Sequence, residues 1–165
     1  SVEDTGLPCE GWVITSPVMQ RMRVFRAFCV SLVVLAASPA FAELTPDQTV
    51  TKYLEAMQGH KFDEAYGYVS SGLRGGKSKE EWSKEQQYIT QMGEVKIFGF
   101  RVFKPVMEGE KAKVPNILKS QDKFLNQLGL DEYELYELIR EDGTWRIDQQ
   151  TLVEGPERSE YFPEN

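Results

Sequence analysis

The segment Asp131–Asp148, DEYELYELIREDGTWRID, predicts an antiparallel hairpin. Its first ten residues place an aromatic or aliphatic side chain at nearly every second position, which is typical of an extended strand. Glu141-Asp142-Gly143-Thr144 follows as the turn, because Asp-Gly tolerates the positive φ angles of a type I′ turn. Trp145 to Asp148 then forms the return strand. This hairpin supplies part of a sheet that the preceding segments have to cover.

Two amphipathic helices are predicted upstream of the hairpin. Thr45-Pro46-Asp47-Gln48 is typical of a helix start, with a capping threonine, a proline at the first position and a glutamine that completes a capping box. The apolar residues that follow have helical spacing and end at Gly59: Val50, Tyr53, Leu54 and Met57. The same spacing then recurs and predicts a second helix that continues the first around a bend: Phe62, Ala65, Tyr66 and Val69.

A third helix and two further strands complete the expected elements. Ser70–Lys77 is predicted as a loop, and Ser78 to Glu81 is a second capping box that begins a helix carrying Trp82 and Ile89. The period then changes to that of a strand over Val95–Lys104, with a bulge or bend at Gly99.

The second of these strands follows a turn at Glu108-Gly109-Glu110 and covers Lys111–Leu118. Pro115 within it predicts an edge strand or an interrupted one, because proline cannot donate to a neighbouring strand. Ser120–Gly129 is predicted as a short helical turn or lid.

Three helices followed by about four strands indicate an α+β fold. We expect the helices to pack in the concave face of a bent, mainly antiparallel sheet, where Trp145 and Ile147 should meet Tyr53, Met57 and Tyr66. The folded domain is predicted to span residues 43–152. Residues 153–165 are predicted to form a polar C-terminal tail, in which Tyr161 and Phe162 are the side chains able to dock.

A signal peptide is predicted ahead of this domain. Residues 19–26 (MQRMRVFR) are basic, and residues 27–37 (AFCVSLVVLAA) form an uninterrupted apolar run. Small residues at 38–42 (SPAFA) then match a cleavage site, so we expect removal of residues 19–42 after Ala42 and export to the bacterial periplasm. The apolar run is shorter than the roughly 20 residues that cross a bilayer, so no stable membrane anchor is expected.

Composition narrows the function classes. Residues 1–18 precede two candidate initiator methionines, Met19 and Met22, and we expect them to lie outside the folded protein. Both cysteines, Cys9 and Cys29, fall before the predicted cleavage site, so neither a disulfide nor thiol chemistry is expected in the domain. The net charge of −7 argues against nucleic acid and anionic membranes as partners.

The order of these sequence features resembles that of the nuclear transport factor two-like superfamily. This is the cystatin-like cone fold, which includes ketosteroid isomerase and scytalone dehydratase. The resemblance rests on the capped first helix, the Gly-His-Lys-Phe-Asp-Glu-Ala-Tyr continuation at 59–66, the Ser-led helix with Trp82, and the closing Glu-Asp-Gly-Thr-Trp-Arg-Ile-Asp at 141–148. It implies helices in the concave side of a bent sheet and a pocket at the wide end. The segment Phe124–Leu128 would lie at the mouth of that pocket, which would be lined by Tyr53, Tyr66, Trp82, Tyr88, Phe100 and Tyr136. The same aromatic residues can instead simply fill the core.

The residues offer few groups for catalysis. His60 is the sole histidine and has no second ligand at metal spacing, so no metal site and no cofactor are expected. Glu137 is a candidate pocket carboxylate that could act with Tyr66 and Tyr136, as isomerase-type chemistry requires. The alternative is that Glu137 forms an ion pair across strands with Lys96, Lys104 or Arg146.

We therefore expect an exported, non-enzymatic domain that binds a small apolar ligand or a partner protein. An isomerase- or dehydratase-like enzyme, with a pocket carboxylate and tyrosine, is the alternative. Apolar residues on both faces of the strands Val95–Lys104 and Asp131–Arg140 also predict a homodimer through the sheet, because the face away from the helices needs cover.

Overall fold

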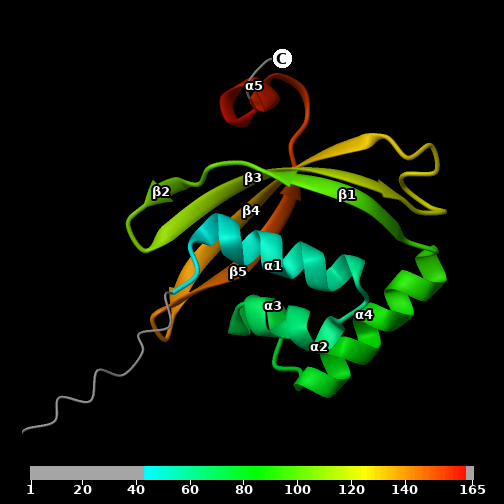
Figure 1. Ribbon diagram of the computed structural model, residues 1–165, viewed down its shortest axis with the longest axis horizontal. Helices are drawn as coiled ribbons and strands as arrows, with labels where there is room; N and C mark the ends of the chain where they lie inside the picture. Colours follow the sequence, from blue (N-terminus) through cyan, green and yellow to red (C-terminus); the bar gives the residue numbers. More distant parts are fainter. Residues whose placement is uncertain (1–42, 163–165) are drawn as a thin grey trace, which may run out of the picture. The chain divides into compact units, whose positions relative to one another are not determined.

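The computed structural model describes residues 43–162. The predicted upstream segment 1–18, the predicted signal peptide 19–42 and residues 163–165 of the predicted tail lie outside the described residues. Within residues 43–162, a curved antiparallel sheet of five strands is combined with helices, which confirms the α+β class (Figure 1). None of the helices in this range is both long and apolar enough to span a membrane.

Helix α1 (Pro46–Gln58) begins where the sequence predicts it. The backbone N–H of Thr45 donates to Gln48 Oε1 at 3.0 Å, and the proline at the first position has no N–H to leave free. The helix ends before Gly59, as predicted, but the left-handed backbone falls one residue later, on His60 at φ 54°. One face of the helix is buried and includes Val50, Tyr53 and Leu54.

The second helix is shorter than its apolar spacing predicts. Helix α2 spans Phe62–Ala65 and continues as a single 3-10 turn over Tyr66–Tyr68. Val69 then pairs with Ile147 at the edge of the sheet, and the N–H of Ser70 donates to the Ile147 carbonyl at 2.8 Å. The helix ends here because this stretch of backbone bonds to the sheet edge instead.

A four-residue helix, α3 (Ser71–Arg74), lies inside the segment predicted as a loop. The hydroxyl of Ser70 caps it by accepting from the N–H of Leu73 at 2.9 Å. The same hydroxyl donates to Asp148 Oδ1 at 2.6 Å, so the start of α3 is fastened to the last strand.

Helix α4 (Lys79–Gly93) confirms the predicted third helix. The N–H of Ser78 donates to Glu81 Oε2 at 2.9 Å, and Ser78 Oγ accepts from the N–H of Glu81 at 3.3 Å, which completes the capping box. The left-handed backbone of Glu94, at φ 52°, ends the helix and turns the chain into strand β1 (Lys96–Val102).

The sheet has the strand order β1-β3-β4-β5, with the short strand β2 paired to β3, and every pairing is antiparallel. The remaining strands are β2 (Val106–Glu108), β3 (Lys111–Gln121), β4 (Asp131–Glu141) and β5 (Thr144–Leu152). The sheet therefore has five strands where about four are predicted. Strand β2 is too short to show a hydrophobic period in the sequence.

Pro115 lies in a central strand, so the prediction that it marks an edge is wrong. Strand β3 is continuous and has β4 on one side and β1 and β2 on the other. The Pro115 carbonyl accepts from the N–H of Phe103 at 2.9 Å, and in an antiparallel strand the N and O of one residue face the same neighbour. The missing N–H of Pro115 therefore faces the break between β1 and β2, where the neighbouring strand is interrupted.

The predicted hairpin and the predicted bulge are both present. Asp142 and Gly143 have φ angles of 50° and 77°, as the turn between β4 and β5 requires. The pairing of β1 with β3 shifts register between Ile97 and Gly99, so the bulge falls beside the expected glycine.

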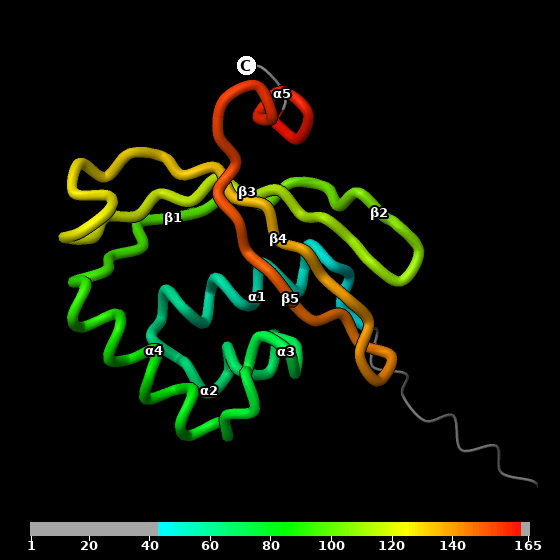
Figure 2. The backbone as a smooth tube through the Cα atoms, turned by 180° about the vertical axis from the view of Figure 1, so that it is seen from behind, coloured from blue at the N-terminus to red at the C-terminus, as the bar shows by residue number. Residues whose placement is uncertain are grey.

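Helices α1 to α4 lie on one side of the sheet, here called the inner face (Figures 1 and 2). Helix α5 (Arg158–Tyr161) lies on the other side, the outer face. Trp145 and Ile147 belong to one buried cluster with Tyr53, and Met57 and Tyr66 pack against it, as predicted. A second, smaller cluster lies on the outer face and consists of Leu135, Val153 and Phe162.

Candidate functional site

Four of the aromatic residues predicted to line a pocket are packed in pairs, one pair between α1 and the inner face and the other between helical segments. Tyr53 and Tyr136 meet edge to face, with ring centroids 6.2 Å apart. Tyr66 and Trp82 meet in the same way at 5.9 Å. Tyr53, Trp82 and Tyr136 are buried, and Phe100 of β1 is partly buried against the same cluster. These side chains therefore contribute to the core.

The other two predicted site residues lie elsewhere. Tyr88 is on α4 and is 63% exposed. Glu137 of β4 has Lys113 and Gln149 as its register partners, and it shares the outer face with Leu135 because alternate residues of a strand point to the same side. Tyr136 points to the inner face, so the structure does not bring Glu137 and Tyr136 together.

The carboxylate buried beside Tyr136 belongs to Glu134 and not to the predicted Glu137. Glu134 Oε2 accepts from Asn116 Nδ2 at 2.8 Å and from the hydroxyl of Tyr136 at 3.1 Å. Glu134 Oε1 accepts from Gln150 Nε2 at 2.7 Å. Once Tyr136 is taken as a pocket residue, strand alternation places Glu134 beside it, because Glu134, Tyr136 and Leu138 share one face.

Burial dominates the electrostatics of this cluster. It raises the pKa of the Glu134 carboxyl, and the three donors only partly offset the effect. Burial, together with the nearby Glu134, raises the pKa of Tyr53 to about 12 and that of Tyr136 well above its usual value. Both tyrosines are therefore protonated at neutral pH. The remaining acceptor, Asn116 Oδ1, is buried without a partner in the part of the chain that the structure describes.

The segment between β3 and β4, residues 122–130, forms a loop rather than the predicted helical turn. The carboxylate of Asp122 accepts from the backbone N–H groups of Phe124, Leu125 and Asn126 at 2.6, 2.7 and 3.0 Å. These bonds lower the pKa of Asp122. The Asn126 amide in turn accepts from the N–H of Leu130 and donates to the Leu130 carbonyl, both at 2.8 Å. Two short polar side chains thus hold the loop backbone from within.

The apolar side chains of this loop point to solvent as a result. Phe124 is 62% exposed, Leu125 93%, Leu128 84% and Leu130 63%. The loop is fastened to the end of α4, because the N–H of Lys123 donates to the Gly93 carbonyl at 2.9 Å. This contact places the loop beside the exposed side of α4.

A groove of about 370 Å³ lies between the loop and α4 and is lined mainly by carbon. We call it the apolar groove; its lining residues are Tyr88, Ile89, Met92, Gly93, Val95, Asp122, Phe124 and Leu125. Tyr88, Ile89 and Met92 follow one another at i, i+1 and i+4 on α4, and each exposes about half of its side chain or more. Tyr88 is thus a predicted pocket residue that lines a hollow at the surface; Phe100 lines another, of about 450 Å³.

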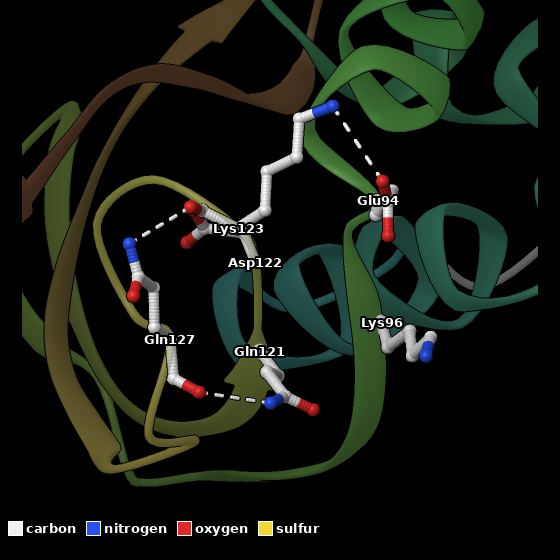
Figure 3. A pocket seen from close by; sticks show the side chains of 6 residues that line it. All are labelled: Glu94, Lys96, Gln121, Asp122, Lys123 and Gln127. Atoms are coloured by element: carbon white, nitrogen blue, oxygen red, sulfur yellow. Dashed lines mark hydrogen bonds and ion pairs between the residues drawn. The ribbon is translucent and has the colours of Figure 1, made fainter.

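A polar hollow of about 320 Å³ adjoins the groove and shares Asp122 with it. Its other lining residues, shown in Figure 3, are Glu94, Lys96, Gln121, Lys123 and Gln127. The ammonium of Lys123 pairs with Glu94 at 3.5 Å, and Gln121 Nε2 donates to the Gln127 carbonyl at 2.9 Å. The ammonium of Lys96 points away from the others in Figure 3.

The outer face, predicted to form a dimer interface, is partly covered by the end of the chain itself. Phe162 is buried against Tyr133 and Phe103, with ring centroids 5.0 and 5.5 Å apart. The guanidinium of Arg158 lies 4.1 Å from the ring centroid of Tyr133. Tyr161 and Phe162 of the predicted tail thus do pack on the sheet.

Among residues 43–162, no group of three or more His, Cys, Asp and Glu side chains is arranged to hold a metal ion. The imidazole of His60 stacks on the ring of Phe62, with centroids 5.8 Å apart.

Several solved structures are similar in fold to this chain. A SEC-C motif containing protein from Rhodopseudomonas palustris matches 67% of this chain and 80% of its own, with a TM-score of 0.53 and 13% identity. An NTF2-like protein of unknown function from Cytophaga hutchinsonii matches 68% of this chain and 94% of its own, with a TM-score of 0.42 and 13% identity. Other similar structures are bacterial proteins of unknown function with a cystatin-like fold.

The match to Bd1075 from Bdellovibrio bacteriovorus covers 64% of this chain but only 38% of that protein, with a TM-score of 0.45 and 11% identity. No protein-family model matches the sequence, and no match is found among curated proteins. Identities this low concern the fold alone, since one fold serves unrelated functions.

Proposed function

We propose that this chain is an exported, non-enzymatic protein-interaction domain of the cone fold, and that its binding surface is the apolar groove with the adjoining loop. The observation that carries the proposal is the exposure of Phe124, Leu125 and Leu128 beside the exposed residues of α4. Soluble proteins rarely leave large apolar side chains grouped in this way unless the surface binds something.

The extent of the apolar surface favours a protein over a small ligand. The volume of about 370 Å³ would suit a small apolar molecule, the other occupant that the sequence leaves open. However, Leu128 and Leu130 are exposed outside the groove lining, where such a molecule would leave them in water. A protein surface can cover the groove and the rest of the loop together.

The lining offers little for catalysis. Asp122 is its sole acidic side chain, and both of its carboxylate oxygens already accept backbone N–H groups of the loop. The hydroxyl of Tyr88 is the other titratable group. Neither has a partner in the lining that would activate it as a base or a nucleophile.

Export is part of the same proposal and is supported by the basic and apolar segments of residues 19–37 and the small residues before Glu43. The sequence also suggests a homodimer through the outer face of the sheet. That interface has weaker support than the groove, because Phe162 and Val153 already cover Leu135 within one copy.

The alternative is an isomerase- or dehydratase-like enzyme, and the contact between Glu134 and the Tyr136 hydroxyl is the observation that favours it. Such an enzyme would abstract a proton from carbon, so it would exchange that hydrogen with solvent. We expect no deuterium incorporation from D₂O into a panel of ketones above the blank rate, measured by NMR. Exchange that is lost in Glu134→Gln would establish the enzyme instead.

Native mass spectrometry of the protein purified from its own cells tests the binding proposal. We expect the protein in an assembly, either with another protein or with a second copy. Leu125→Glu should remove that assembly, because it places a charge in the apolar surface. Met107→Glu is the control, since Met107 is another exposed apolar residue but lies on β2, outside the lining of the groove. An assembly that survives Leu125→Glu, or a bare monomer in all three samples, would refute the proposal.

A further inference from the structure

The apolar surface is large enough for a complete interface. Aromatic side chains carry roughly 150–250 Å² each and aliphatic ones somewhat less, so seven such residues, each exposed by about half or more, present on the order of 600–800 Å² to solvent. The seven are Tyr88, Ile89, Met92, Phe124, Leu125, Leu128 and Leu130. A stable interface of standard size buries about 800 Å² on each partner. The surface on this chain is therefore close to the size that one side of a stable dimer requires.

The surface also combines two complementary shapes. The groove between α4 and the loop is hollow and apolar, while Leu128 stands clear of it and is 84% exposed. A two-fold axis places the same patch on both sides of an interface, so a projection on one copy can fill a hollow on the other. A patch that carries both a hollow and a projection suits such a symmetric contact.

The charges at the border of the patch permit two copies to approach. Glu94 pairs with Lys123 at 3.5 Å, and Asp131 pairs with Lys119 at 3.8 Å, so each pair is neutral. The chain as a whole carries a net charge of −7, so two copies repel each other overall. The local neutrality of this border removes that repulsion where the copies would meet.

The loop is prepared for binding by its own hydrogen bonds. Asp122 and Asn126 fix the backbone that carries Phe124, Leu125 and Leu128. Fewer conformations are then lost on association, which lowers its entropic cost.

We propose that the partner at this surface is a second copy of the chain, in a two-fold symmetric dimer in which Leu128 of each copy enters the apolar groove of the other. The inference rests on the proposed function and names the occupant of the same surface.

The experiment is sedimentation equilibrium of the purified protein alone, across the micromolar range. We expect a reversible dimer in the wild type and in Met107→Glu. In Leu128→Glu the dissociation constant should rise by about 100-fold or more, because the dimer would bury a charge in the groove. Leu128 is exposed in the single copy, so its replacement should leave folding intact, which the circular dichroism spectrum checks.

Hydrogen exchange supplies a second readout that locates the interface. Amides of residues 123–130 and of α4 near Met92 should exchange more slowly at concentrations where the dimer forms, and only in proteins that dimerise. A dimer that persists in Leu128→Glu, or protection confined to the outer face, would overturn the inference.

Two outcomes separate the second copy as partner from the interaction domain itself. A pure protein that stays monomeric, but is recovered from its own cells with a different protein bound through Leu125, overturns the second copy as partner and leaves the interaction domain standing. A monomer that retains a small molecule in the groove, or whose groove is filled by residues 1–42, overturns both.

Discussion

Glu134 shows how one residue can combine a structural and a titrating role. Its carboxyl group is buried in the inner face and receives three side-chain donors, from Asn116, Tyr136 and Gln150. The donors hold the polar group in the core, because a buried acceptor without partners would cost about 1–3 kcal/mol. Burial nevertheless outweighs them and raises the pKa of the carboxyl above its usual value of 4.5.

The raised pKa predicts how stability depends on pH. The folded state holds the Glu134 proton more tightly than the unfolded state does, so the free energy of unfolding falls as pH rises from about 4.5 through the raised pKa. Glu134→Gln lacks this titration. We expect it to be less stable than the wild type by about 1 kcal/mol below pH 4.5, because an amide offers one oxygen to three donors. The difference should shrink or reverse as pH rises.

Urea denaturation of both proteins across this pH range measures the effect. Glu137→Gln is the control, since Glu137 lies on the outer face of the same strand and should keep the pH dependence of the wild type. Parallel pH profiles for the wild type and Glu134→Gln would show that the Glu134 carboxyl does not titrate as its burial requires.

The position of Glu134 also marks a limit of strand alternation. Tyr133 and Leu135 make one face of β4 apolar, and Tyr136 and Leu138 make the other apolar as well. The pattern therefore shows which residues share a face but not which face meets the helices. The C-terminal segment covers the other face with Tyr161 and Phe162, and the sequence indicates that these side chains can dock but not where.

At the scale of the element, the features predictable from sequence are those set by neighbouring residues. The capping boxes at Thr45 and Ser78, the turn at Asp142 and the bulge beside Gly99 each depend on a few adjacent side chains. Pro115 could not be placed in this way, because its tolerance in a central strand depends on a break in another strand. The groove likewise depends on contact between α4 and the distant loop at 122–130.

The backbone of the loop at 122–130 is held by the carboxylate of Asp122. Asp122→Ala should free three backbone N–H groups, so the amides of Phe124, Leu125 and Asn126 should exchange with solvent much faster. Overall unfolding should change little, because the loop lies outside the core. The pKa of Asp122 is lowered, so in the wild type the loop should keep its protection down to the usual value of 3.8 and lose it as pH falls below.

Asp131→Ala supplies the comparison for this loop. Asp131 lies at the far end of the loop and pairs with Lys119, and its carboxylate is not among the acceptors of the loop amides. NMR-detected exchange should therefore change in Asp122→Ala alone. Equal rates in the two variants would mean that Asp122 does not hold the loop.

At the scale of the whole described region, the sheet is covered on both sides by one chain. Helices α1 to α4 cover the inner face, and the end of the chain returns over the outer face (Figures 1 and 2). Part of the apolar outer face, with Leu135 at its centre, therefore has cover within a single copy. The groove beside α4 has no such cover within the described residues.

Phe162→Ala tests whether the end of the chain stabilises the fold by covering the outer face. The ring of Phe162 is buried and meets Tyr133 and Phe103 edge to face, so its removal should lower the free energy of unfolding by about 2–3 kcal/mol, less than the 3–5 kcal/mol of a central core position. Phe98→Ala is the matched control, because Phe98 is 61% exposed on the bulge of β1 and should cost less than about 1 kcal/mol. Urea denaturation gives both values.

The same variant separates the two candidate interfaces. If copies associate through the groove, Phe162→Ala should leave the dimer dissociation constant unchanged, because the outer face takes no part in that contact. If they associate through the outer face, loss of Phe162 should change the constant, since it alters the surface around Tyr133 and Leu135. A shift in self-association without any effect of Leu128→Glu would therefore assign the dimer to the sheet and leave the groove for another partner.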